Sequence, residues 1–117
     1  LMQQALLNIA LNAIKAMPDG GRFTVETRLE PAEGDTPGSI KVQFSDTGHG
    51  IAPENLSRIF NPFFTTRQQG TGLGLSITQR IVEQHQGDIS VKSTPDRGAV
   101  FTISLPFSSG GKEARST

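Results

Sequence analysis

Residues 39–51 read SIKVQFSDTGHGI and join a strand-like segment to a glycine-rich turn. Along residues 39–46, the apolar Ile40, Val42 and Phe44 alternate with polar side chains, which is the pattern of a strand with one buried face. This strand ends on Asp46, and the turn after it carries Gly48 and Gly50. Such glycines let the backbone approach a flat ligand closely, and the carboxylate can accept a hydrogen bond from that ligand. A turn that binds nothing would have the same pattern, so this segment alone leaves both interpretations open.

On either side of this segment, helical and strand-like patterns follow one another along the chain, separated by Gly and Pro residues. In order, we expect a helix over 1–17, strands over 22–29 and 39–46, helices over 52–60 and 73–86, and strands over 88–93 and 99–105. Gly87 is expected to cap the longer of the two later helices, and Pro106 to end the last strand. This order predicts the α+β class: a two-layer sandwich with helices on one face of a mixed, largely antiparallel sheet.

The composition indicates one domain without cysteine chemistry. A chain of 117 residues has room for one core, which we place over residues 1–107, with a disordered tail over 108–117. Eleven Lys and Arg residues balance eleven Asp and Glu residues, which gives no support for contact with nucleic acid or membrane. There is no cysteine, and no apolar run approaches the roughly 20 residues of a membrane span. We therefore expect a cytoplasmic domain, and the helix that starts at residue 1 without a capping residue predicts an upstream segment.

Three polar side chains of the first predicted helix, Asn8, Asn12 and Lys15, fall within about 60° of one another around the helix axis. Gln4 lies on the same stripe, whereas most other residues of this helix are apolar. Burying an amide or ammonium group without a polar partner costs about 1 to 3 kcal/mol or more, so the stripe must face something polar. It is therefore either the solvent side of an amphipathic helix or the wall of a ligand site.

A second glycine-rich segment, GTGLGLS at residues 70–76, leads directly into the helix expected over 73–86. Glycines at a helix N-terminus expose backbone N–H groups that can receive phosphate. The segment lacks the Gly-Lys-Ser/Thr end of a P-loop, and the order of strands and helices is not that of a dinucleotide-binding fold. By itself it is weak support for a phosphate site.

Taken together, four motifs resemble, in order and spacing, the boxes of sensor histidine kinases. NIALNA at 8–13 resembles the asparagine box, DTGHGI at 46–51 the first glycine box, IFNPFF at 59–64 the phenylalanine box and GTGLGL at 70–75 the second glycine box. The resemblance covers residues 1–106 and implies the Bergerat-type, ATP-binding catalytic domain of the gyrase, chaperone, histidine kinase and mismatch-repair superfamily. The short loop between the last two boxes is similar to that of nitrogen-regulation kinases. Such domains have one more strand ahead of the first helix, which we expect this chain to lack.

The resemblance implies that the helix stripe and the second glycine segment form the phosphate side of an ATP site. Asn12 would bind the Mg²⁺ that bridges the phosphates, and Asn8 and Lys15 would contact phosphate oxygens directly or through water. Residues 65–74 would close over the phosphates as a lid, with Arg67 either stabilising charge on the transferring phosphoryl group or freely solvated. The residues expected at the ligand here are Thr65, Thr66, Arg67, Gly70, Thr71, Gly72, Leu73, Gly74 and Leu75.

The same resemblance implies that the first glycine box forms the adenine side. Asp46 would accept a hydrogen bond from the adenine amino group. Gly48 and Gly50 would leave room for the base, and Ile51 would line its pocket. Thr102, on the last predicted strand, would also lie near the adenine.

One position of the asparagine box distinguishes a kinase from a hydrolase. In the gyrase and mismatch-repair ATPases, a glutamate four residues before the metal-binding asparagine activates water, whereas Asn8 stands at that place here. An amide cannot accept a proton, so the general base for water attack is missing. The resemblance therefore favours phosphotransfer over hydrolysis.

The phosphate acceptor is expected outside this chain. Neither His49 nor His85 is followed by the acidic and polar residues of an acceptor motif, so we expect both to be structural. The resemblance implies two partners: a histidine-bearing helical dimerisation domain of the same protein, and the receiver domain of a response regulator. Two alternatives stay open, namely a nucleotide-binding regulatory module without phosphotransfer and a serine kinase of the anti-sigma type.

Overall fold

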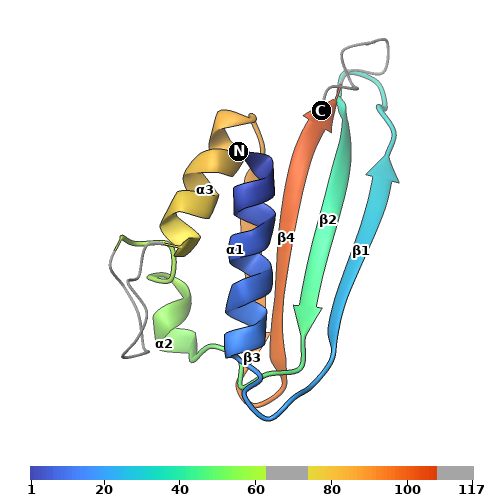
Figure 1. Cartoon of the computed structure of the whole chain (residues 1–117). Helices are drawn as coiled ribbons and strands as arrows, with labels where there is room; N and C mark the ends of the chain where they lie inside the picture. The colour runs from blue at the N-terminus through green and yellow to red at the C-terminus, as the bar shows by residue number, and fades with distance from the viewer. Residues whose placement is uncertain (63–73, 108–117) are drawn as a thin grey trace.

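The computed structural model describes residues 1–62 and 74–107 of the chain. Its elements are, in order, α1 (Met2–Lys15), β1 (Phe23–Glu30), β2 (Gly38–Asp46), α2 (Pro53–Leu56), α3 (Gly74–Gln84), β3 (Asp88–Thr94) and β4 (Gly98–Phe107). The helices form one layer and the strands the other, so the α+β class predicted from the sequence is confirmed (Figure 1). Within the described ranges, no helix is long and apolar enough to cross a bilayer.

The four strands form one sheet in the order β1-β2-β4-β3, and all of these neighbours pair antiparallel. Several boundaries differ from expectation: α2, expected over 52–60, ends at Leu56, and β4 continues past Pro106 to Phe107. The pairing of β4 with β3 reaches only as far as Ser104, so Pro106 has a neighbouring strand on the β2 side alone. A proline, which has no N–H to donate, is tolerated where one side of a strand is unpaired.

The core lies between the inner face of the sheet and the helices. Alternation along the strands directs Phe44 of β2 and Phe101 and Ile103 of β4 toward this layer. α1 supplies Ile9 and α3 supplies Val82, and all five side chains are at most 5% exposed. Burial of a side chain of this size contributes about 1.5 to 3 kcal/mol, so this cluster holds the two layers together.

The C-terminus of α3 ends in a Schellman motif. Its residue with left-handed backbone conformation is not Gly87, which we expected to cap the helix. Gln86, and not Gly87, has the left-handed backbone conformation, with φ of 64°. The Gln86 N–H donates to the Glu83 carbonyl oxygen (2.9 Å) and the Gly87 N–H to that of Val82 (3.0 Å). Gly87 serves close packing instead, because a Cβ there would collide with the carbonyl oxygen of Ser104 on β4.

Replacing Gln86 by glycine should therefore raise the free energy of unfolding by about 0.5 to 1 kcal/mol, because glycine adopts the left-handed conformation without a Cβ penalty. Gln86→Ala is the matched control: it removes the same side chain but keeps the Cβ, and it should leave stability within about 0.5 kcal/mol of the parent. Urea denaturation of the three proteins measures the difference. Equal stability of the two variants would contradict backbone strain at this position.

Candidate functional site

The turn that follows β2 is docked on the C-terminal end of α1. The His49 N–H donates to the carbonyl oxygen of Ala16 (3.2 Å). Gly48 lies so close to this point that a Cβ would collide with the same carbonyl group. Because Ala16 is one helical turn beyond Asn12, the contact places the turn that begins at Asp46 next to the polar stripe of α1.

Asp46 is a buried carboxylate with one oxygen bonded and the other available. Its side chain is 7% exposed. The Oδ1 atom accepts hydrogen bonds from the Gly48 N–H (2.9 Å) and from the Ala99 N–H of β4 (3.3 Å). Among the residues that the structure describes, none donates to Oδ2. The carboxylate is thus held in place through one oxygen, and the other can accept a hydrogen bond from a ligand.

The hairpin between β3 and β4 holds the same turn from its other side. The Asp96 N–H donates to the His49 carbonyl oxygen (2.7 Å), and the Ile51 N–H donates to Ser93 Oγ (2.6 Å). Gly50 has φ of 74°, and a Cβ on it would collide with the carbonyl oxygen of Thr94. The Cβ positions of both glycines of the turn therefore face protein atoms, so close packing accounts for them before any ligand is considered.

The polar stripe of α1 faces the start of α3. The Asn8 side chain donates from Nδ2 to the carbonyl oxygen of Gly74 (3.2 Å) and accepts at Oδ1 from Gln4 Nε2 (3.0 Å). Asn12 is half-buried, and Lys15 is exposed one turn further along. Neither of these two side chains forms a hydrogen bond or ion pair with another residue of the described part. Both remain able to bind a ligand between the helices and the turn.

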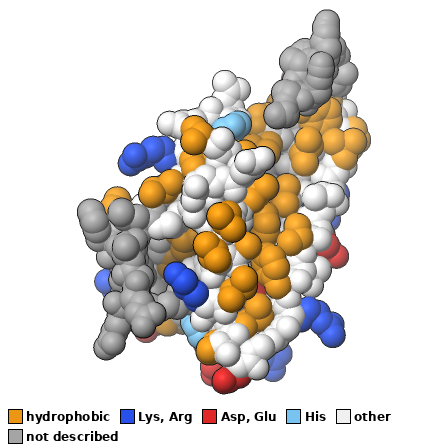
Figure 2. Space-filling model, in the orientation of Figure 1, with side chains coloured by type: hydrophobic (Ala, Val, Ile, Leu, Met, Phe, Trp, Pro, Cys, Tyr) orange, Lys and Arg blue, Asp and Glu red, His pale blue; other side chains and the backbone are white. Residues whose placement is uncertain are grey.

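The opposite, outward side of α1 is apolar, which separates the stripe from an ordinary solvent face. Leu7, Leu11 and Ile14 are 52%, 44% and 58% exposed. Around the helix axis, these three residues lie about 140° to 200° from the buried Ile9. The polar stripe lies on one flank of the helix, between this apolar side and the side that carries Ile9. Figure 2 shows apolar side chains gathered on this face of the molecule. The Asn8 amide bonds to α3, which favours the interpretation of the stripe as the wall of a site between the helices.

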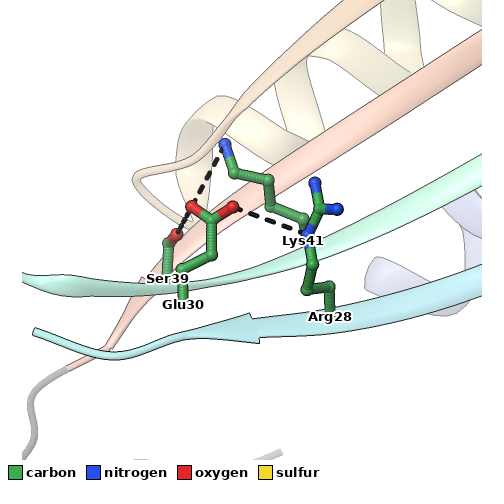
Figure 3. A network of polar contacts seen from close by, with 4 residues as sticks. All are labelled: Arg28, Glu30, Ser39 and Lys41. Atoms are coloured by element: carbon green, nitrogen blue, oxygen red, sulfur yellow. Dashed lines mark hydrogen bonds and ion pairs between the residues drawn. The ribbon is translucent and has the colours of Figure 1, made fainter.

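Thr102 is not brought to this group of residues. It pairs with Gln43 of β2 and Ser90 of β3 on the outer face of the sheet. Asp46 lies two residues after Phe44 on β2 and therefore shares the inner face with it. That outer face carries its own polar network, in which Glu30 contacts Arg28 (3.6 Å), Lys41 (3.8 Å) and Ser39 (3.4 Å) (Figure 3). The residue of β4 that does reach Asp46 is Ala99, through its backbone N–H.

Several predicted site residues lie outside the described part of the chain, so their placement stays a prediction. They are Thr65, Thr66, Arg67, Gly70, Thr71, Gly72 and Leu73. Of the others, Ile51 and Leu75 pack against the core. Sequence reasoning missed Ser93, although a signal existed: it is a polar residue at an inward position of β3, in line with the apolar Ile89 and Val91.

The packing of Gly48 predicts a stability effect that requires no ligand. Gly48→Ala should lower the free energy of unfolding by about 1 to 3 kcal/mol, because the added methyl group must displace the turn from α1. Gly74→Ala is the control, since a Cβ at Gly74 meets no atom of the described residues within 4 Å. Thermal unfolding without nucleotide measures both variants. A Gly48→Ala variant as stable as Gly74→Ala would show that the turn has space at this glycine.

The sequence of the chain is similar to a known protein family and to named sensor kinases. The family described as "Histidine kinase-, DNA gyrase B-, and HSP90-like ATPase" matches residues 1–109. The sensor histidine kinase ZraS of Salmonella typhi is 50% identical over 105 residues, which are 90% of this chain and 22% of that protein. The chain therefore spans about a fifth of the length of this relative.

Solved structures of sensor histidine kinases share the fold, among them the following two. The mycobacterial sensor histidine kinase MprB has a TM-score of 0.71 at 33% identity, covering 88% of this chain and 70% of that one. Full-length ShkA in complex with AMPPNP has a TM-score of 0.73 at 32% identity, covering 90% of this chain and 21% of that one. The chain belongs to the histidine kinase-, DNA gyrase B- and HSP90-like ATPase family, and within it to the ATP-binding catalytic domains of sensor histidine kinases.

Proposed function

We propose that this domain binds Mg-ATP between α1, the turn after β2 and the start of α3, and transfers the γ-phosphate to a histidine of a separate helical dimerisation domain. The observation that carries the proposal is the Asp46 carboxylate, which is buried and held through Oδ1, with Oδ2 accepting no hydrogen bond from the described residues. The turn on which it lies is docked on the helix that carries Asn8, Asn12 and Lys15. One end of the site can thus recognise a base and the other can bind phosphates.

The adenine end depends on a carboxylate that can only accept hydrogen bonds. Asp46 Oδ2 would accept from the adenine amino group, and a charge-assisted hydrogen bond of this kind contributes about 1.5 to 3 kcal/mol. A guanine presents a carbonyl oxygen at the same place, so two acceptors would face one another. Ile51, which is half-buried at the end of the turn, would line the pocket of the base.

The phosphate end depends on Asn12 and Lys15. Amide oxygens are among the hard oxygen ligands that Mg²⁺ accepts, and the Asn12 amide is not used by any described neighbour. These residues therefore fit a magnesium nucleotide, and a bound Mg²⁺ would supply neutralisation of the phosphate charge. Lys15 adds a cation one turn further along, and Asn8, with one Nδ2 hydrogen engaged by Gly74, has a second for a phosphate oxygen or water.

The same helix argues for transfer rather than hydrolysis. No Asp or Glu occurs in α1, so no carboxylate of this helix can activate a water molecule. Asn8, at the position of the hydrolytic glutamate, is fixed by Gln4 and Gly74 and cannot accept a proton. Phosphoryl transfer to an imidazole needs mainly positioning and charge neutralisation, for which Arg67 remains a sequence-based candidate.

The acceptor is proposed to lie on another domain, because the two histidines here are engaged locally. His49 Nδ1 lies 2.9 Å from the carbonyl oxygen of Gly50, and His85 Nδ1 lies 2.8 Å from that of Ile81. We infer that a histidine-bearing dimerisation domain of the same protein receives the phosphoryl group and passes it to the receiver domain of a response regulator. Both steps would take place in the cytoplasm, where ATP is available.

Asp46→Asn should weaken ATP binding about tenfold to a hundredfold, because the adenine amino group loses a charge-assisted partner. The parent should bind GTP poorly. Asp88→Asn makes the same chemical change at an exposed residue on the outer face of the sheet and should leave affinity unchanged. Isothermal titration with ATP and GTP, each with Mg²⁺, measures these effects. Equal affinity of the parent for the two nucleotides would count against the role of Asp46.

Phosphotransfer is tested by supplying a cognate histidine-bearing hairpin in trans with γ-labelled Mg-ATP. The expected product is label on the hairpin that is labile to acid and stable to alkali, with none on this chain alone. Asn12→Ala should abolish the labelling, because the Mg²⁺ ligand is lost. Acid-stable label on serine would instead indicate a kinase of the anti-sigma type. Binding of ATP without any labelling would indicate a regulatory nucleotide module.

A further inference from the structure

Ser93 joins the two parts of the molecule that define the adenine side of the site. It lies at the end of β3 on the inner face of the sheet, half-buried beside the turn after β2. Its Oγ accepts a hydrogen bond from the Ile51 N–H (2.6 Å) and donates to the carbonyl oxygen of Gly98 (3.1 Å). The hydroxyl therefore acts as donor and acceptor at once, between two backbone groups that are far apart in sequence.

The contact with Gly98 connects Ser93 to the carboxylate of Asp46 through a single peptide group. The Gly98 carbonyl and the Ala99 N–H belong to the same planar unit. Its oxygen accepts from Ser93, and its N–H donates to Asp46 Oδ1 (3.3 Å). Rotation of this peptide plane would break both bonds together, so the Ser93 hydroxyl restrains the donor that orients Asp46.

The backbone around this peptide group lets it lie directly against β2. Gly98 has φ of 111°, and a Cβ on it would collide with the carbonyl oxygen of Asp46. On the other side, Gly50 would place a Cβ 3.1 Å from Ser93 Oγ, so the hydroxyl is in contact with the turn as well. Ser93 thus lies at the junction of three backbone segments, each of which contributes to the position of Asp46 or Ile51.

We propose that Ser93 is a positioning residue for adenine recognition, which acts by fixing the Gly98–Ala99 peptide group and the Ile51 backbone so that Asp46 presents Oδ2 to the base. The proposal rests on the proposed function of Asp46 as the adenine acceptor. Ser93 does not touch the base itself. Its hydroxyl keeps Ala99 bonded to Oδ1, which leaves the other carboxylate oxygen for the amino group of the ligand.

The test compares ATP with ITP, in which a carbonyl group replaces the adenine amino group. The parent chain should prefer ATP about tenfold or more. Ser93→Ala should lower this preference about three- to tenfold, as expected for a net loss of one or two hydrogen bonds. Ser93→Thr retains the hydroxyl on a residue suited to a strand and should keep the preference near the parent value. Isothermal titration with each nucleotide in the presence of Mg²⁺ gives the two affinities.

Ser90→Ala is the matched control, because Ser90 lies on the same strand but is exposed on the outer face. It should leave the ratio of affinities unchanged. Thermal unfolding of all variants is measured in parallel, since a purely structural role of Ser93 would weaken ATP and ITP binding equally. In an Asp46→Asn background, Ser93→Ala should produce no further change in the ratio, because the carboxylate through which it acts is gone.

The outcomes separate the two proposals. A parent chain that binds ATP and ITP equally would overturn the role of Asp46, and the role of Ser93 with it. A parent that discriminates, together with a Ser93→Ala variant that discriminates equally well, would overturn the role of Ser93 alone. A selective loss in Ser93→Ala, restored in Ser93→Thr and absent in Ser90→Ala, would support it.

Discussion

The contact between the turn after β2 and the carbonyl group of Ala16, the C-cap residue of α1, is the constraint on which the site depends. The final carbonyl groups of a helix have no partner within the helix, so they must bond elsewhere. Here the Ala16 carbonyl accepts from the His49 N–H, and Gly48 allows the two backbones to approach. Without this contact, Asp46 and the stripe of Asn8 and Asn12 would belong to unconnected surfaces of the two layers.

The β3–β4 hairpin contacts the turn after β2 from the side opposite α1 and holds the turn against that helix. The Asp96 N–H, the Ser93 hydroxyl and the Ala99 N–H contact three different points of the segment between Asp46 and Ile51. A loop held by backbone bonds from both sides has little conformational freedom left to lose when a ligand binds. The turn that we propose as the adenine side of the site is therefore held in place by contacts within the protein.

α1 shows how one helix can serve three environments. Its buried side carries the small and branched residues Ala5, Ile9 and Ala13, of which Ile9 packs in the core with Phe44 and Phe101 of the sheet. One flank carries the polar stripe toward α3, and the outward side is apolar. A division of this helix into an apolar core face and a polar solvent face would misplace the stripe. The exposed side carries Leu7, Leu11 and Ile14, whereas the half-buried Asn8 bonds to α3.

By itself, the sequence determined the order of the elements, the α+β class, the strand that ends on Asp46 and the polar stripe of α1, because periodicity and turn residues are local properties. It also contained the alternation that excludes Thr102 from the inner face and includes Ser93. Only the tertiary structure decided that Ala99 bonds to Asp46, 53 residues away, and that the turn glycines face protein. Such contacts depend on strand register and on how the layers pack, and neither is encoded in the pattern of any single segment.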